Sequence, residues 1–205
     1  MIVLDHDQGT PEWFAARMGK PSASCFSKLI TTKGKPSTSA GKYITQLTSE
    51  CLTGESEPFY VNDHMLRGTE LEPEARDSYE FITGNWVEEY GFILDDSEVF
   101  GCSPDGLIEV CSEGMGKGGI EIKCPAAATQ VKYMLNPQEL VKQYYQQIQG
   151  CMLVTGREWW DAFSYHPKTR HVLVRVPRDE EFITKLAVEI KAATDEILNQ
   201  VEQLK

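Results

Sequence analysis

Residues 103–124 read SPDGLIEVCSEGMGKGGIEIKC, and this stretch predicts a β-hairpin with charged residues near its open end. The Gly-rich centre favours a turn between two β-like runs. Residues two apart in a strand point to the same side, so Glu121 and Lys123 should project together, about 7 Å apart, while Ile122 faces the core. Pairing of the two strands would bring Asp105 beside Glu121 and Lys123.

These residues predict a site for a divalent cation. Two close carboxylates repel each other unless a cation neutralises them, and their hard oxygens suit Mg²⁺ or Mn²⁺. Such an ion lowers the pKa of a bound water, polarises a phosphate and stabilises a leaving oxygen. Lys123 would orient or help deprotonate the attacking water. The alternative on these residues alone is that Asp105 begins a turn, while Glu121 and Lys123 form an exposed charge pair.

The rest of the chain alternates helix and strand signals, which favours an α/β fold (α+β) with one central mixed sheet flanked by helices. Ser22 and Asp179 are expected to cap helices, and Pro73 predicts a kink or a helix restart just after Glu72. We expect helices over residues 23–30, 43–52, 63–82, 136–154 and 179–205. We expect strands over residues 87–94, 105–110, 119–124, 159–165 and 171–176.

The length of 205 residues, with 41% hydrophobic and 25% charged residues, predicts one globular domain over residues 1–205. Within it we expect a helical N-terminal part over about 12–84, a core over about 85–177 and a C-terminal helix over about 179–205. No basic segment followed by an apolar run opens the chain, and no stretch approaches the roughly 18 apolar residues of a membrane span. We therefore expect a cytoplasmic protein with no membrane partner.

Charge is unevenly distributed in this chain, whose formal net charge is -11. Six basic residues and no acidic one lie between Trp13 and Ser49, whereas 18 acidic and four basic residues lie between Glu50 and Pro125. The net charge argues against a general nucleic-acid coat protein. The segregation suits an enzyme that holds a polyanion with one region and metal ions with another, although a solvated Lys-rich loop explains the basic segment equally well.

Pro104-Asp105 followed by Glu121-Ile122-Lys123 reproduces the signature of the PD-(D/E)xK nuclease superfamily. The surrounding sequence resembles, in order, the YqaJ-like viral recombinase family, to which bacteriophage lambda exonuclease belongs. The resemblance covers most of the chain, from Trp13 to about Pro177, and implies a restriction-endonuclease-like core. The matching residues are Trp13, Arg17-Met18-Gly19, Ser22-Ala23-Ser24, Arg67-Gly68, Glu72, Ala75-Arg76, Cys102-Ser103-Pro104-Asp105-Gly106-Leu107, Glu121-Ile122-Lys123-Cys124-Pro125, Tyr144, Gln147, Gln149 and Val154-Thr155.

By this resemblance, the metal ligands would be Asp105, Glu121, the backbone carbonyl of Ile122 and Glu72. The choice of Glu72 over its neighbours Glu70 and Glu74 depends on the resemblance alone. Lys123 would be catalytic together with these carboxylates, and Gln147 would lie near Lys123 and the attacking water. Arg17 and Ser24 match residues that bind the 5′ phosphate of a DNA end, for which a guanidinium fork and a helix N-terminus are suitable partners.

The function implied by the resemblance is a Mg²⁺-dependent 5′ to 3′ exonuclease on linear duplex DNA that leaves 3′ single-stranded tails for phage-type strand annealing. Two Mg²⁺ ions per site, with Mn²⁺ as a substitute, are implied. The implied partners are DNA with a 5′-phosphorylated end, two further copies in a homotrimeric ring, and a single-strand-annealing recombinase. A bacterial cell, with a phage or prophage origin, is the implied setting.

Three alternatives stay open from the sequence. A Cas4-like exonuclease would hold an iron-sulfur cluster with three cysteines near its C-terminus, whereas the last cysteine here is Cys151. A restriction-type endonuclease would cut closed circles. A non-catalytic DNA-binding module with the same fold would usually lack part of the metal set, whereas Asp105, Glu121 and Lys123 are all present.

Overall fold

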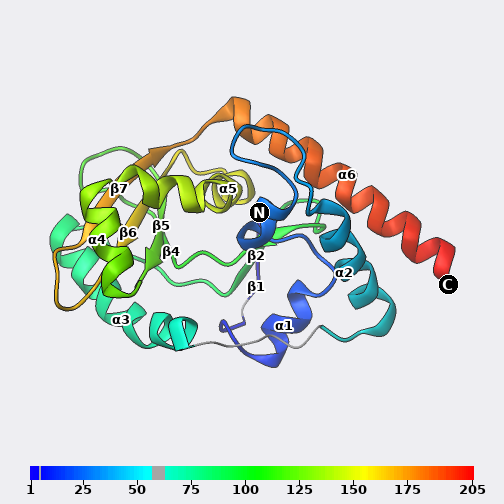
Figure 1. Cartoon of the computed structure of the whole chain (residues 1–205), viewed down its shortest axis with the longest axis horizontal. Coiled ribbons are helices and arrows are strands. Elements are labelled where there is room, and N and C mark those ends of the chain that lie inside the picture. Colours follow the sequence, from blue (N-terminus) through cyan, green and yellow to red (C-terminus); the bar gives the residue numbers. More distant parts are fainter. Residues whose placement is uncertain (5, 57–62) are drawn as a thin grey trace.

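The structure is a computed structural model that describes residues 1–4, 6–56 and 63–205. Its helices are α1 (Pro11–Arg17), the 3₁₀ helix η1 (Ala23–Lys28), α2 (Ala40–Thr53), α3 (Asp63–Thr83), α4 (Ala127–Leu135), α5 (Gln138–Thr155) and α6 (Glu180–Leu204). Its strands are β1 (Ile2–Leu4), β2 (Phe92–Leu94), β3 (Gly101–Cys102), β4 (Gly106–Ile108), β5 (Gly118–Lys123), β6 (Trp159–Ser164) and β7 (Val172–Pro177). Figure 1 shows this arrangement.

The strands form two sheets and not the single central sheet that we predicted. One is a three-stranded antiparallel sheet in the order β1-β2-β3, and the other has the order β4-β5-β6-β7, with β5 and β6 parallel. The predicted strand over 87–94 is divided between them, because Glu88 bridges to Leu107 beside β4 while β2 pairs with β1. The division falls at Gly91, where a Cβ atom would lie 1.6 Å from the carbonyl oxygen of His6.

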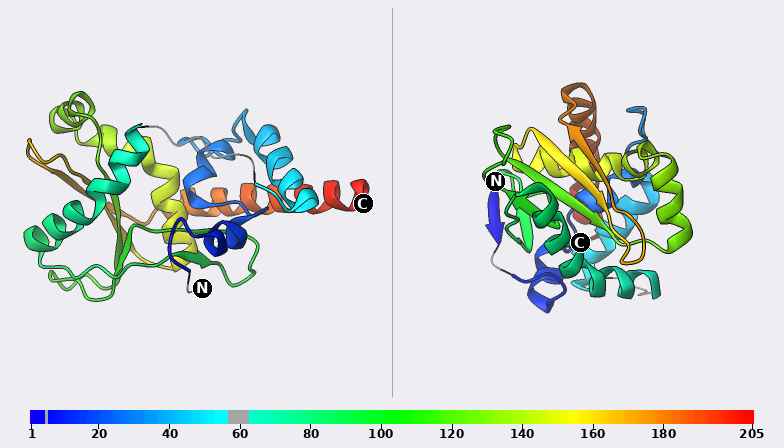
Figure 2. Two further views of the ribbon diagram at one scale, coloured as in Figure 1. Left: turned by 90° about the horizontal axis from the view of Figure 1, so that it is seen from below. Right: turned by 90° about the vertical axis from the view of Figure 1, so that its left-hand side faces the viewer.

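The four-stranded sheet is covered by helices on both faces, as predicted, and this mixed α/β arrangement is visible in Figures 1 and 2. Tyr79 of α3 packs with Ile120 and Ile122 on one face, whereas Ile148 of α5 packs with Trp160 on the other. Glu121 lies between Ile120 and Ile122 in the strand, so its side chain points to the opposite face, toward α5. This side chain is also buried.

The predicted β4–β5 hairpin is confirmed, and glycines explain how its second strand joins the sheet. Gly106 pairs with Ile120 in the antiparallel ladder, and Gly119 pairs with Trp160 in the parallel one. A Cβ atom on Gly119 would lie 2.4 Å from the indole of Trp160. A Cβ atom on Gly118 would likewise lie 2.1 Å from the indole of Trp159. The two glycines therefore leave room for Trp159 and Trp160, which are both buried.

Several helices differ from the prediction. The segment after Ser22 is a 3₁₀ helix with no side-chain cap, and α1 and α4 were not predicted. Helix α3 continues through Pro73 without a restart, and Ala75 and Tyr79 on the following turns are buried in the core, so the alternative of a kink stays a prediction. Asp179 caps α6 as predicted, accepting a hydrogen bond from the backbone of Phe182.

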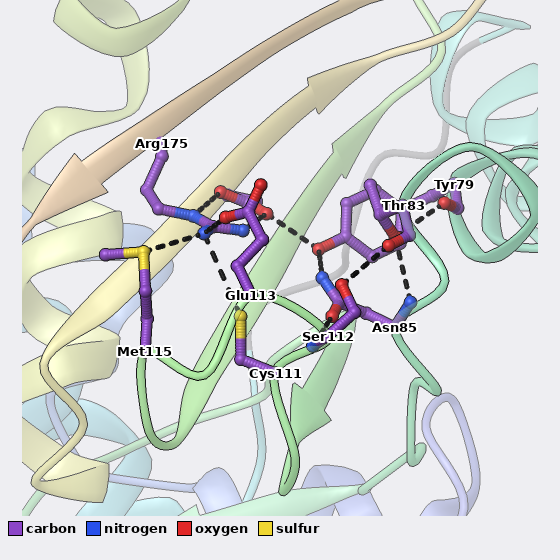
Figure 3. Close-up of polar contacts among 9 residues, drawn as sticks. Tyr79, Thr83, Asn85, Cys111, Ser112, Glu113, Met115 and Arg175 are labelled. Carbon is purple, nitrogen blue, oxygen red and sulfur yellow. Dashed lines mark hydrogen bonds and ion pairs between the residues drawn. The ribbon is translucent and has the colours of Figure 1, made fainter.

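A polar network fixes the tip of the hairpin to the end of α3 (Figure 3). Buried Asp161 of β6 accepts two hydrogen bonds from the Arg175 guanidinium, at 2.9 and 2.8 Å, and one from the Tyr79 hydroxyl at 2.7 Å. Arg175 also pairs with Glu113 of the hairpin turn. The backbone of Ser112 donates to Asn85, which follows α3. The network therefore joins two elements that also carry predicted site residues.

The predicted division at about residues 84 and 178 remains a prediction. A shared hydrophobic cluster includes Phe26 of the N-terminal part, Trp160 of the core and Leu186 of α6. None of the helices in the described ranges is long and apolar enough to cross a bilayer.

Candidate active site

The open end of the hairpin brings Asp105 to the backbone of β5. The ladder between β4 and β5 starts at Gly106, and the Asp105 carboxylate accepts a hydrogen bond from the backbone N–H of Ile122 at 2.6 Å. This carboxylate thus takes the position that the next backbone carbonyl of a continuing strand would have. The geometry fixes an acidic side chain at the edge of the sheet.

The three residues that define the sequence signature lie together, as predicted. The Lys123 ammonium forms an ion pair with Glu121, donates to the carbonyl oxygen of Ile122 at 3.0 Å and lies 3.7 Å from Asp105 Oδ2. It therefore contacts or approaches three of the oxygen-bearing groups that the resemblance names as metal ligands. One positive charge already occupies the centre of this oxygen cluster.

Helix α5 supplies the neighbouring polar groups. The Gln147 amide donates to Glu121 Oε1 at 2.6 Å, so the structure places this predicted residue in the site. One turn earlier, the ring centroid of Tyr144 lies 5.1 Å from the Lys123 ammonium, a cation–π contact. The sequence analysis assigned Tyr144 no role, although its spacing from Gln147 puts both on one helix face.

Helix α3 brings Glu72 to the other side of the cluster. Glu72 accepts from Arg76 at 3.1 Å, and Arg76 also binds Glu89 at 2.7 Å. Its neighbour Glu74 instead accepts from the Tyr165 hydroxyl at 2.5 Å, and Glu70 is exposed. Burial, followed by repulsion from the Asp105 carboxylate, raises the pKa of Glu72 to about 7. This electrostatic coupling is a physical reason, absent from the sequence, to favour Glu72 among the three.

The electrostatics of the cluster show an excess of negative charge. Burial, followed by repulsion from Asp105, raises the pKa of Glu121 to about 8, although Lys123 opposes the shift. Burial alone would lower the pKa of Lys123, but Glu121 and Asp105 outweigh it and raise that pKa well above its usual value. A single ammonium therefore does not neutralise these carboxylates.

The residues present fit a divalent cation. Oε2 of Glu121 is buried and has no hydrogen-bond partner within the described part of the chain, and the donors are hard oxygens. Across residues 1–4, 6–56 and 63–205, no three histidine, cysteine or carboxylate side chains already form a compact metal site. Asp105, Glu121 and the Ile122 carbonyl are gathered at Lys123, whereas Glu72 is still held by Arg76.

A second cluster surrounds Arg17, at the end of α1. The guanidinium donates to Ser103 at 2.9 Å, to Ser22 at 3.3 Å and to Ser24 at 3.5 Å, and lies 4.1 Å from the centroid of the Trp13 ring. Within the described residues it forms no ion pair with a carboxylate. Arg17 and Ser24 thus lie together as predicted, in a half-buried positive site with exposed Ser24 at its opening.

The expected helix-dipole contribution at Ser24 is corrected by the structure. A macrodipole requires several turns of aligned peptide units, whereas η1 is a six-residue 3₁₀ helix. The donors that this cluster offers are therefore the guanidinium and hydroxyl groups.

Ser103 was missed as a site residue by the sequence analysis. Its hydroxyl oxygen accepts from Arg17 and also from the indole N–H of Trp13 at 3.0 Å. These two donors use the acceptor capacity of the oxygen, so its own hydrogen is free to be donated. Ser103 immediately precedes Pro104-Asp105, and that position was the available signal.

Comparison with known proteins decides the family. The YqaJ-like viral recombinase domain matches residues 12–158. The chain belongs to this family. The structure of an alkaline exonuclease, LHK-Exo, from Laribacter hongkongensis is 36% identical with a TM-score of 0.80, and the match covers 95% of this chain and 96% of that chain. LHK-Exo in complex with dAMP gives 37% identity and a TM-score of 0.83, covering 96% of each chain.

A phage related exonuclease from Haemophilus somnus 129PT shares the fold, with 18% identity and a TM-score of 0.73 over 91% of this chain and 96% of that chain. No curated protein matches the chain significantly. The present chain, as a member of the YqaJ family, is thus a nuclease of the alkaline exonuclease type.

Proposed function

We propose that this YqaJ family nuclease is a Mg²⁺-dependent 5′ to 3′ exonuclease that digests one strand of linear duplex DNA and leaves 3′ single-stranded tails. The observation that carries the proposal is the direct link between two clusters: Ser103 belongs to the cationic hydroxyl site, and Asp105, two residues later, belongs to the carboxylate–lysine site. An anion held by the first is therefore adjacent to the second.

The Arg17 site fits the terminal 5′ phosphate of a DNA strand. Its guanidinium lacks a carboxylate partner within the described residues, while Ser24 and the free hydrogen of Ser103 add donors that a phosphate oxygen accepts. The relative LHK-Exo has been crystallised with dAMP, a deoxynucleoside monophosphate. Exonucleolytic digestion of DNA releases molecules of this class.

Asp105, Glu121 and the Ile122 carbonyl, with Glu72, would hold Mg²⁺ or Mn²⁺, and we propose two ions per site. When bound, the metal supplies Lewis-acid activation of the phosphate and of the attacking water. Lys123 offsets negative charge that develops on the phosphate oxygens, and Gln147 orients groups beside Glu121. Arg76 holds Glu72 beside the site, where this carboxylate would be available as a ligand.

The setting of this activity completes the proposal. We propose a homotrimeric ring that admits duplex DNA, a single-strand-annealing recombinase as the partner that receives the 3′ tails, and a bacterial cytoplasm as the location. An acidic exterior, with a net charge of -11 per chain, is compatible with a basic channel that receives the polyanion.

The test compares three substrates: linear duplex with a 5′ phosphate, the same duplex with a 5′ hydroxyl, and a closed circle, each with Mg²⁺ or EDTA. We expect Mg²⁺-dependent release of mononucleotides from the 5′-phosphorylated end. Lys123→Ala should abolish release, whereas Lys117→Ala, an exposed lysine in the hairpin turn, should leave it unchanged. Arg17→Ala should remove the preference for the 5′ phosphate.

Cleavage of the circle at the rate of the linear duplex would contradict exonuclease action. Full activity of Lys123→Ala would contradict the assigned chemistry. A preference for the 5′ phosphate that survives in Arg17→Ala would remove the phosphate site while leaving the nuclease assignment intact.

A further inference from the structure

Strand β7 forms an edge of the four-stranded sheet and has unused backbone groups. The backbone of Arg178 donates to the carbonyl of Glu158 at 2.8 Å, which sets the alternation along β7. Residues 172, 174 and 176 therefore direct their N–H and C=O groups toward β6, whereas Leu173 and Arg175 direct theirs outward. In the described part of the chain, no hydrogen bond reaches the outward backbone groups of these two residues.

At one end of this edge, the outward backbone groups are already hydrogen-bonded by a side chain. The Gln149 amide donates to the carbonyl of Pro177 at 2.9 Å and accepts from the backbone N–H of Asp179 at 2.9 Å. These are the two bonds that one residue of a parallel fifth strand would form through its own N–H and C=O. Gln149 thus takes the place of a neighbouring strand at the end of β7. It does not reach the outward backbone groups of Arg175.

An open groove runs beside the unfinished part of the edge. It has a volume of about 690 Å³ and lies between β7 and α5. Its apolar wall is formed by Val141, Tyr145, Val174 and Val176. Every second side chain of an added strand would point to the α5 face, where this wall receives it.

The segment that contains β7 is basic, although Asp179 and Glu180 line the far end of the groove. Residues 166–178 contain Lys168, Arg170, Arg175 and Arg178 and no acidic residue, in a chain whose net charge is -11. Arg175 and Arg178 are ion-paired. Lys168 and Arg170 are exposed in the turn before β7 and form no ion pair with any residue that the structure describes. An acidic group at this end of the edge would find two free cations.

We propose that the β7 edge binds an extended segment of a partner protein as a fifth strand. The segment pairs with the backbone of Leu173 and Arg175, inserts an aliphatic side chain into the groove and places acidic residues at Lys168 and Arg170. The C-terminal end of α6 lies at the opposite end of the molecule from β7 (Figure 1). The inference does not depend on the nuclease proposal.

The test uses the full chain and a fluorescein-labelled hexapeptide with two glutamates followed by alternating valine and threonine. A matched peptide carries N-methyl groups on alternate amides and cannot pair with a strand. Leu173→Pro removes an N–H that points away from β6, so it spares the ladder, and Leu173→Ala is its control for the lost side chain. We expect saturable binding that weakens at least about tenfold with the methylated peptide and with Leu173→Pro relative to Leu173→Ala.

Hydrogen exchange provides a second measurement that needs no variant. The amides of Leu173 and Arg175 should exchange more slowly when the peptide is bound, even if Leu173→Pro fails to fold. Failure of the unmethylated peptide to bind at about 1 mM, or equal binding of the two peptides, would overturn the proposal. Displacement of the peptide by duplex DNA would assign the surface to nucleic acid instead, and self-association that Leu173→Pro abolishes would assign it to a second copy; both results overturn it.

Discussion

Glu121 and Asp161 are buried carboxylates on neighbouring strands, but they face opposite sides of the same sheet and have opposite environments. Asp161 is matched by two guanidinium nitrogens of Arg175 and by the Tyr79 hydroxyl. Glu121 shares one ammonium with Asp105 and leaves Oε2 without a partner in the described residues. A buried carboxylate with all its bonds made holds elements together, whereas one with a bond missing is available to a ligand.

The largest effect is expected on nuclease activity, when Glu121 is replaced. Glu121→Gln keeps the shape of the side chain but removes a charge from the proposed metal site, so nuclease activity should fall by about 100-fold to 1,000-fold. Initial rates of mononucleotide release measure this loss. Wild-type activity in Glu121→Gln would show that the unpaired carboxylate has no role in the reaction.

The same substitution should change how the free energy of unfolding depends on pH. The raised pKa of Glu121, about 8 against an ordinary 4.5, means that the folded protein retains a proton that the unfolded chain releases. The free energy of unfolding of the metal-free wild type should therefore fall as the pH rises through this interval. Glu121→Gln should reduce the fall in urea titrations at pH 5 and pH 8, and an unchanged pH dependence would contradict the assigned environment.

Asp161→Asn should lower the free energy of unfolding strongly and affect nuclease activity much less than Glu121→Gln does. Removing one partner of a buried ion pair costs about 3 kcal/mol or more, and here it also weakens the hydrogen bond from Tyr79. Urea denaturation measures the change. Glu113→Gln, which removes the exposed partner of the same arginine, is the matched control and should cost less than about 1 kcal/mol.

Mg²⁺ should stabilise the folded protein through the incomplete site only. At about 100 times its dissociation constant, a ligand that binds only the folded state adds about 2.7 kcal/mol to the free energy of unfolding. Wild type and Asp161→Asn should both gain this increment in thermal melts, and Glu121→Gln should lose most of it. An equal gain in all three proteins would place the ion elsewhere.

A smaller effect than that of Asp161→Asn is expected at Tyr79→Phe. This change removes the hydrogen bond to Asp161 and the acceptor of the Asn85 amide, which donates to the hydroxyl at 3.1 Å, but it leaves the bidentate arginine pair intact, so it should cost about 2 kcal/mol. A loss as large as that of Asp161→Asn would show that the hydroxyl, and not the ion pair, maintains the network.

The parts of the fold that follow from local pattern were predictable. The hairpin, the alternation of Glu121 and Lys123, and the capping of α6 by Asp179 each depend on residues close in sequence, and the structure confirms them. The split into two sheets depends on a close approach between Gly91 and His6, 85 positions away, which no local pattern encodes. The helix α4 directly precedes α5 and lacks a side-chain cap, so its start carried no signal.

The candidate site shows the same limit. Asp105, Glu121 and Lys123 share one hairpin, and their convergence could be inferred from its geometry. The role of Ser103 as a double acceptor depends on Trp13 and Arg17, which are distant in sequence. The preference for Glu72 over Glu74 depends on which carboxylate lies close to Asp105 and which one Tyr165 already binds. Both features are set by tertiary contacts.

The Ser103-Pro104-Asp105 segment has a consequence for the size of the product. Two residues of chain span at most roughly 7 Å, and the proline between them restricts one backbone angle. A terminal phosphate anchored at one end and a scissile bond placed at the other would be separated by that covalent length. The segment would then act as a molecular ruler, and the step of the enzyme along the strand would be one nucleotide, set by peptide geometry and independent of base sequence.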